Sequence, residues 1–304
     1  MSIQWYPGHM HKASKAIQET LSQVDLIIEV LDARIPFSSE NPMISTLRGN
    51  KPCIKVLTKC DLADPIITKQ WQDFFEQEKG VKTQAFSIEQ PEKIRKLTEL
   101  CRKMVSNKNI VHALIMGIPN VGKSTLINIL AGKSIAKTGN EPAVTKTQQR
   151  INLPNNIVLS DTPGILWPKI ENENSGYRLA TTGAIKDTAI NADDIAFFAA
   201  ETLLKIYPNM LLSRYALEQL PASEWDFFET IGRKRGCLKS GGQVDLNKIC
   251  SIFLNELRSG TIGQISLETP AVVKQELAEL EQQKAQLKEQ QSTKKTTRKK
   301  RRKR

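Results

Sequence analysis

The distribution of apolar residues along the first half of the chain predicts a sheet of buried strands. Short, nearly continuous apolar runs cover residues 25–34, 53–57, 85–88 and 112–116. Runs of this length that are rich in Ile, Val and Leu are typical of parallel strands covered on both faces. Helical patterns alternate with them, at 12–24, 66–79 and 91–105. This alternation predicts a mostly parallel, doubly wound α/β sheet, and a turn at 154–156 predicts a hairpin between strands at 148–153 and 157–159.

The pattern changes after about residue 169, where a polar stretch at 172–176 is typical of a turn. Beyond it, apolar residues recur at helical spacing, and helices are expected over 191–205, 224–233 and 244–258. We therefore expect an α/β domain over 1–170 and a small α-helical domain over 177–270. Residues 271–304 would form a charged helical stem followed by a disordered basic tail.

The charge is concentrated at the C-terminus. Nine of the last eleven residues are Lys or Arg, whereas the formal net charge of the whole chain is +12. Such a block does not fold by itself and seeks polyanions, so RNA or DNA is the expected partner, with a solubility tail as the alternative. No apolar run approaches the roughly 20 residues of a bilayer span, and no secretory leader is evident. Five scattered cysteines without a CxxC pair argue against a zinc site or disulfide framework. We expect a cytoplasmic protein with no membrane partner.

Residues 117–124 read Gly-Ile-Pro-Asn-Val-Gly-Lys-Ser, between an apolar strand and a helical run. This is the strand–GxxxxGK[ST]–helix pattern of a phosphate-binding loop, whose backbone N–H groups surround phosphate oxygens. In this pattern Lys123 reaches the β- and γ-phosphates, and the Ser124 hydroxyl is a ligand of Mg²⁺. The expected nucleotide-binding residues of this segment are Asn120, Val121, Gly122, Lys123, Ser124 and Thr125.

Asp161-Thr162-Pro163-Gly164 follows the next strand, 37 residues after Ser124. A carboxylate at this strand end would hold Mg²⁺ through water, and the Gly164 amide would sense the γ-phosphate. The long polar connection before it contains Thr145, whose hydroxyl would complete the Mg²⁺ shell when a triphosphate is bound.

Thr58-Lys59-Cys60-Asp61 follows the apolar run at 53–57 and resembles the guanine-reading N/T-K-x-D motif. A carboxylate at Asp61 accepts hydrogen bonds from N1–H and N2–H₂ of guanine, which adenine does not offer. The stem of Lys59 would pack on the purine face, and the amide of Ser87 would support the base. The alternative for this motif alone is a surface turn.

The motifs occur in a rotated order, since the base-reading motif precedes the phosphate loop. In this the sequence resembles the circularly permuted GTPases and, within them, the ribosome biogenesis GTPase A family. The resemblance extends from the segment WYPGHM at 5–10 through these motifs into the helical segment that begins YRLATTGAIKDT at 177–188, and it covers roughly residues 1–270. It implies a circularly permuted P-loop GTPase domain, Mg²⁺ and GTP, and a role in late assembly of the large ribosomal subunit with hydrolysis stimulated by the particle. The sequence departs from the family pattern at Thr58, where Asn is usual.

Many GTPases position water with a Gln directly after DxxG, but this position is Ile165. The family resemblance points to His9 as the catalytic group, and a packing or RNA-contact histidine is the alternative. By resemblance to K⁺-dependent GTPases, Asn120 is the residue that would bind a monovalent cation.

Besides the tail, Arg233, Lys234, Arg235 and Lys239 form a basic segment that we expect to be an exposed, glycine-flanked loop contacting rRNA. A solvated helix end is the alternative. We expect a monomer that binds GTP and GDP and the large ribosomal subunit. A GTPase of another RNA pathway and a GTP-gated RNA-binding module remain as alternative functions.

Overall fold

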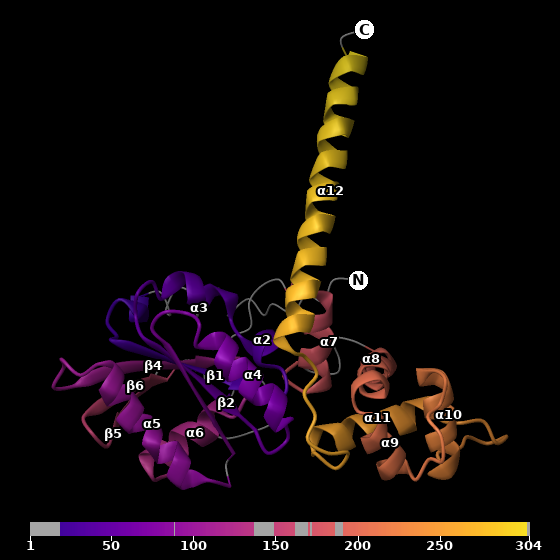
Figure 1. Ribbon diagram of the computed structural model, residues 1–304, viewed down its shortest axis with the longest axis horizontal. Helices are drawn as coiled ribbons and strands as arrows, with labels where there is room; N and C mark the ends of the chain where they lie inside the picture. The colour runs from indigo at the N-terminus through magenta and orange to yellow at the C-terminus, as the bar shows by residue number, and fades with distance from the viewer. Residues whose placement is uncertain are drawn as a thin grey trace.

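The computed structural model of the chain, shown in Figure 1, describes residues 19–87, 89–136, 149–161, 170, 172–185 and 191–302. The side chains of residues 43, 45, 46, 149 and 287–302 are outside this description. A sheet domain lies on one side and a domain of helices on the other, and a long C-terminal helix leaves the molecule between them.

The sheet has six strands in the order β3-β2-β1-β4-β6-β5. Five are parallel: β1 (Leu26–Asp32), β2 (Cys53–Thr58), β3 (Val81–Phe86), β4 (Val111–Gly117) and β6 (Ile157–Asp161). The edge strand β5 (Gln149–Leu153) is antiparallel to β6, and the hairpin between them turns at Asn155 and Asn156, both with positive φ. The prediction of a mostly parallel α/β sheet is thus confirmed.

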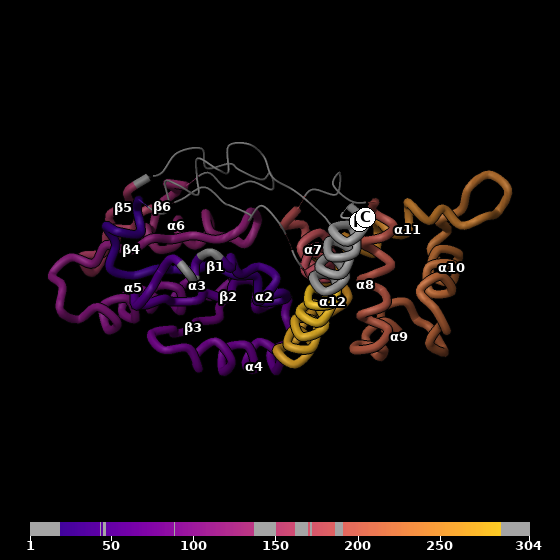
Figure 2. The backbone as a smooth tube through the Cα atoms, turned by 90° about the horizontal axis from the view of Figure 1, so that it is seen from above, coloured from indigo at the N-terminus to yellow at the C-terminus, as the bar shows by residue number. Residues whose placement is uncertain are grey.

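Helices connect the strands on the outside of the sheet: α2 (Pro36–Ser39), α3 (Pro42–Leu47), α4 (Pro65–Phe75), α5 (Pro91–Met104) and α6 (Lys123–Ala131). The start of α4 is fixed by Asp64, whose carboxylate accepts the N–H groups of Ile66 and Ile67, and by Pro65. Helix α4 then buries Trp71 and Phe75. As Figure 2 shows, the strands form the middle of this domain.

The second domain consists of α7 (Glu173–Thr181), α8 (Ala192–Ile206), α9 (Pro208–Tyr215), α10 (Glu224–Lys234) and α11 (Leu246–Arg258). Its core includes three mutually packed rings, Phe227, Phe228 and Phe253, with centroids 5.3–5.7 Å apart. The expected turn at 172–176 is wrong, because Asn172 caps the start of α7 by accepting the N–H of Asn174. Asn favours turns and helix caps alike, so its presence alone does not separate the two.

The segment between α11 and the last helix contacts the sheet domain. The Leu267 N–H donates to the Arg34 carbonyl at 2.9 Å, and the Trp71 indole donates to the Glu268 carbonyl at 3.0 Å. Burial raises the pKa of the Glu268 carboxyl, although Arg178 and the Ser38 hydroxyl and N–H act in the opposite direction. Polar contacts from the buried Glu268 therefore join the two domains at this point.

Helix α12 (Pro270–Arg302) extends to residue 302, within the basic segment that we expected to be disordered. Lys, Arg, Gln and Glu all have high helix propensity, so the backbone of this segment favours a helix once the stem has started one. In the described part of the chain, no single helix has the length and apolarity of a bilayer span. Helices α8 and α9 reach these values only together, across a bend of 110°.

Candidate nucleotide-binding site

The predicted nucleotide-binding motifs meet at one edge of the sheet. Because β1, β2, β3, β4 and β6 are parallel, their carboxyl ends lie on the same side, and the register pairs Thr58 with both Asp32 and Phe86. Gly117 pairs with Val30 of β1, and Asp161 pairs with Ile115 of β4. The strand order reverses beside β1 and β4, where open α/β sheets bind their ligands. The rotated order of the motifs along the chain thus gives a single compact site.

The phosphate-binding loop connects β4 to α6. A Cβ atom on Gly117 would lie 2.6 Å from the Val30 carbonyl oxygen, so only glycine fits against β1. Gly122 has φ +92° and caps α6, a conformation that favours glycine. Ser124 and Thr125 lie half-buried in the first turn of α6. The free N–H groups of this turn and the helix dipole favour an anion here.

Lys123 and Asp161 form a buried ion pair, with the ammonium nitrogen 2.6 Å from the carboxylate. Lys123 is 6 % exposed and Asp161 is fully buried. The contact places the carboxylate at the end of β6 directly beside the start of α6 and its Ser124. Carboxylate and hydroxyl oxygens are hard ligands, so this pair of residues suits Mg²⁺.

Thr58 connects the base-reading motif to the phosphate loop. Its hydroxyl lies 2.9 Å from the Leu31 carbonyl and 2.5 Å from the Val121 carbonyl. A threonine at this position thus bridges β1 and the loop. Ser87 is buried next to the motif, where its hydroxyl accepts the Glu89 N–H at the entrance to α5. Val121 is buried and Cys60 is half-buried.

Lys59 has φ +58°, and its ammonium group donates to the Asn120 carbonyl at 2.8 Å and to the Asp32 carboxylate at 2.9 Å. Asp32 also accepts two side-chain hydrogen bonds from Arg34. Burial would raise the pKa of Asp32, but Arg34 and Lys59 hold it well below its usual range. Sequence reasoning missed Asp32 and Arg34, although an acid and a base directly after a buried apolar run are a signal for such a pair.

Asp61 follows this lysine and is half-buried. Its backbone carbonyl accepts the side-chain amide of Gln264 at 3.2 Å. Within the described residues, the Asp61 carboxylate accepts no hydrogen bond, which leaves it available for the two donors of a guanine edge. Three other predicted residues, His9, Thr145 and Gly164, lie outside the described residues.

The predicted RNA-binding residues lie in the helical domain, apart from this edge. All four are exposed, but Arg233 and Lys234 belong to the last turn of α10 rather than to a loop. Arg235 pairs with Glu256 at 2.9 Å and lies over the Tyr215 ring. Lys239 lies in the turn that follows, where its N–H donates to the Gln243 carbonyl.

The expectation that glycine keeps this segment exposed is wrong for Gly232. This residue is buried, and a Cβ atom there would lie 2.4 Å from Val244. Gly232 is therefore required for close packing of α10 against the segment that precedes α11.

Comparisons with known proteins show the family of the chain. The sequence model of a family described as 50S ribosome-binding GTPase matches residues 112–212. Ribosome biogenesis GTPase A of Priestia megaterium is 44% identical over 289 residues, which are 91% of this chain and 100% of the relative. The protein of that name from Thermotoga maritima is 34% identical and covers 88% of this chain and 95% of the relative.

Two solved structures are similar to most of this chain. A GDP-bound YlqF has a TM-score of 0.62 and 31% identity over 84% of this chain and 99% of its own. A GNP-bound YlqF from T. maritima has a TM-score of 0.61 and 31% identity over 85% and 98%. On its sequence, its fold and the motifs gathered at one sheet edge, the chain belongs to the ribosome biogenesis GTPase A family.

Proposed function

We propose that this protein binds and hydrolyses GTP during assembly of the large ribosomal subunit, contacts rRNA, and is stimulated in hydrolysis by the particle. The observation that carries the proposal is the meeting of Asp61, Lys123 and Asp161 at one sheet edge despite their separation along the chain. The family membership of the chain supports the choice of the ribosome over another RNA pathway.

Guanine would be selected by Asp61, with the stem of Lys59 on the purine face and the Ser87 amide behind the base. The available Asp61 carboxylate supports this role, because a buried acceptor that stays unpaired rejects the wrong base. The residues that would surround the base are Thr58, Lys59, Cys60, Asp61 and Ser87.

The phosphates would lie on the loop from Asn120 to Thr125, with the Lys123 ammonium moving from Asp161 to the β- and γ-oxygens. Mg²⁺ would be held by Ser124 and Asp161, with Thr145 completing its shell, and when bound it neutralises charge on the phosphates. Gly164 would contact the γ-phosphate, and Asn120 would hold K⁺. We propose His9 as the group that orients the attacking water, since Ile165 has no polar group.

Positive charge supports contact with RNA. Arg233, Lys234 and Lys239 are exposed on the helical domain, and residues 294–302 of the basic segment lie at the end of α12. These groups would bind phosphates without reading sequence. Arg235 contributes less, because its guanidinium is committed to Glu256 and Tyr215. We propose that the protein acts as a cytoplasmic monomer.

The test is GTP turnover with and without purified large ribosomal subunits, with ATP as the control nucleotide. Strong GTP-selective stimulation is the expected result. Fast turnover without particles would overturn the requirement for the ribosome. GTP binding without turnover in either condition would indicate instead a GTP-gated RNA-binding module.

A further inference from the structure

A groove of about 490 Å³ lies at the edge of the sheet opposite the nucleotide site. It is lined by residues that precede three parallel strands, among them Asp25 before β1, Pro52 before β2 and Lys108, three positions before β4. A strand of six or seven residues is about 20 Å long, so the groove is separated from the nucleotide by the thickness of the domain.

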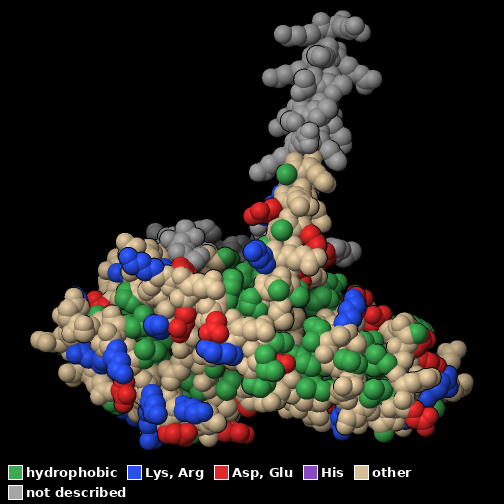
Figure 3. All heavy atoms as spheres, in the orientation of Figure 1, with side chains coloured by type: hydrophobic (Ala, Val, Ile, Leu, Met, Phe, Trp, Pro, Cys, Tyr) green, Lys and Arg blue, Asp and Glu red, His purple; other side chains and the backbone are tan. Residues whose placement is uncertain are grey.

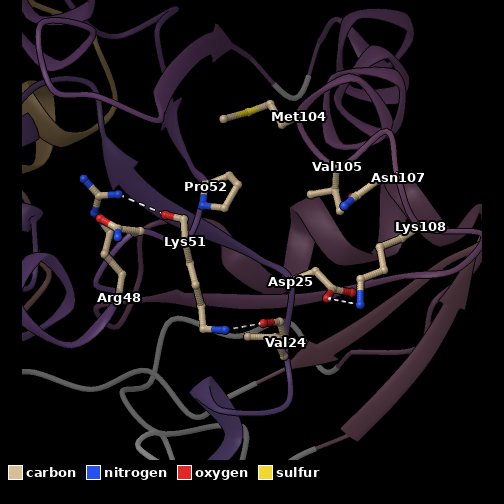
Figure 4. Close-up of a pocket in the computed structure, with 10 residues that line it drawn as sticks. Val24, Asp25, Arg48, Lys51, Pro52, Met104, Val105, Asn107 and Lys108 are labelled. Carbon is tan, nitrogen blue, oxygen red and sulfur yellow. Dashed lines mark hydrogen bonds and ion pairs between the residues drawn. The ribbon is translucent and has the colours of Figure 1, made fainter.

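Two lysines from different loops line this groove, and each reaches the segment before β1, as Figure 4 shows. The Lys51 ammonium donates to the Val24 carbonyl at 2.8 Å, and the Lys108 ammonium lies 3.5 Å from the Asp25 carboxylate. Because Val24 and Asp25 are consecutive, the two lysines are anchored on neighbouring residues of the same segment. An ammonium group has three donors, so each lysine keeps donors for a ligand.

Each lysine-bearing loop is fixed by an arginine that binds the lysine's own carbonyl. Arg48 donates to the Lys51 carbonyl at 2.9 Å, and Arg102 donates to the Lys108 carbonyl at 2.8 Å. Arg102 also donates to the Asn109 carbonyl. The cations are thus presented by loops of defined geometry, which lowers the entropic cost of binding.

The rest of the groove is apolar at its base and polar at its rim. Val24 and Val105 are buried, Pro52 and Met104 are half-buried, and the amides of Asn50 and Asn107 are exposed. The groove is lined by three cations, Arg48, Lys51 and Lys108, and by one carboxylate, that of Asp25. Arg48 is neutralised by Glu78, which leaves the two lysines. On the face drawn in Figure 3, Lys and Arg side chains lie mostly over the sheet domain.

We propose that this groove binds single-stranded RNA, with one phosphate between Lys51 and Lys108 and the adjoining sugar or base on the apolar base of the groove. The proposal rests on the proposed function, from which it takes rRNA as the partner. A volume of this size suits one nucleotide unit. The apolar base favours an unpaired nucleotide, because the bases of a duplex are stacked and do not reach a protein surface in this way.

The test compares binding of a fluorescein-labelled 12-nucleotide oligouridylate to the full chain across a KCl series. The variant is Lys51→Ala/Lys108→Ala, and the control is Lys69→Ala/Lys82→Ala. The control removes the same charge on another part of the domain, from lysines that pair with Asp73 and Glu76. The basic tail contributes equally to both proteins.

We expect the groove variant to bind about tenfold more weakly near 100 mM KCl, with a salt slope smaller by about 1. The control should stay within about twofold of wild type. Normal GDP binding at the opposite edge will show that the variant is folded. The single variant Lys108→Gln is a milder change, and we expect it to lose about half as much binding free energy for the oligonucleotide. Equal weakening in the control would overturn the proposal.

Cosedimentation with large subunits separates the other outcomes. If the groove variant loses the subunit but binds the oligonucleotide normally, the groove faces a ribosomal protein and the RNA proposal is wrong. If the variant keeps both, the groove has no role, while subunit-stimulated GTP turnover would still support the proposed function. If the proposed function itself is wrong, the wild-type protein will show no stimulation of GTP turnover by large subunits.

Discussion

The Asn120 side-chain amide, in the phosphate-binding loop, donates a 2.9 Å hydrogen bond to the Gly183 carbonyl of the helical domain. Gly183 lies two residues after α7, whose end is also held by Arg258 of α11. The Arg258 guanidinium donates to the Ala180 and Thr181 carbonyls, both at 2.9 Å. The carboxyl end of α7 is thus bound from both domains, and the cation complements the negative end of the helix dipole.

Further hydrogen bonds connect Arg258 to the base-reading motif. The Arg258 carbonyl lies 3.5 Å from Arg34, which is paired with Asp32, and Asp32 binds Lys59. Lys59 in turn donates to the Asn120 carbonyl. A closed circuit of hydrogen bonds therefore joins the base motif, the phosphate loop and α7. Asn120, which resemblance assigns to K⁺, would leave Gly183 if it turned to a cation beside the phosphates.

Removal of the Arg258 side chain should weaken the hold on α7. Arg258→Ala loses two hydrogen bonds from a charged donor to carbonyls, so we expect the free energy of unfolding to fall by about 1.5–3 kcal/mol. Urea denaturation measures this loss. Lys205→Ala, which removes an exposed pair with Glu201, should change stability by less than about 0.5 kcal/mol. Equal losses in the two variants would show that Arg258 does not hold the end of α7.

The buried pair of Lys123 and Asp161 predicts a double-mutant effect in the nucleotide-free protein. Lys123→Met removes the cation beside a buried carboxylate and should cost about 3–5 kcal/mol. Lys123→Met/Asp161→Asn removes both charges and should recover most of that stability, although neither protein should bind GTP. Urea unfolding and fluorescent GDP binding measure the two effects. A double variant no more stable than Lys123→Met would contradict the coupling.

Asp61 predicts a change of base specificity. Asp61→Asn replaces an acceptor with an amide donor, which mismatches N2–H₂ of guanine but matches the 2-carbonyl of xanthine. We expect GTP affinity to fall by at least about 100-fold and XTP to bind in its place. Direct titration with labelled GDP and with labelled XDP measures both. The control Asp73→Asn, at an exposed carboxylate of α4, should leave the base preference unchanged. If Asp61→Asn loses all nucleotide binding and does not gain XTP binding, Asp61 has a structural role instead.

The elements that could be predicted from the sequence are those that are buried along their whole length. Every residue of β1 and β2 is buried, so each is either apolar or a polar residue with a bonding partner. Their apolar runs can therefore be recognised in the sequence. Strand β3 extends four residues earlier than expected. It is an edge strand, and its polar residues Lys82, Thr83 and Gln84 need no burial on both faces.

The nucleotide motifs could be predicted because their chemistry depends on short fixed spacings. The circuit through Asp32, Arg34 and Arg258 could not, because it joins residues more than 200 positions apart in the chain. The role of Gly232 was misjudged for the same reason: its neighbour Val244 is near only after folding.

Gly232 allows two opposite effects to be compared. It lies in α10 with no positive φ, so helix propensity alone predicts that Gly232→Ala gains about 1 kcal/mol. The clash with Val244 predicts instead a net loss of about 1–3 kcal/mol. We expect the loss, and we expect Val244→Ala to relieve part of it in the double variant. A stabilised Gly232→Ala would mean that α10 and the segment before α11 are not closely packed.

His9 is tested by separating binding from turnover. If its imidazole orients the attacking water only on the ribosome, His9→Ala should keep GTP affinity and slow basal turnover little. It should lower subunit-stimulated turnover by about 100-fold, the smaller end of general acid–base contributions. His112→Ala, at the start of β4, serves as the control histidine and should keep stimulation. Because a lost RNA contact would reduce subunit binding and be overcome at saturating subunits, a defect in maximal turnover that persists there identifies a chemical role for His9.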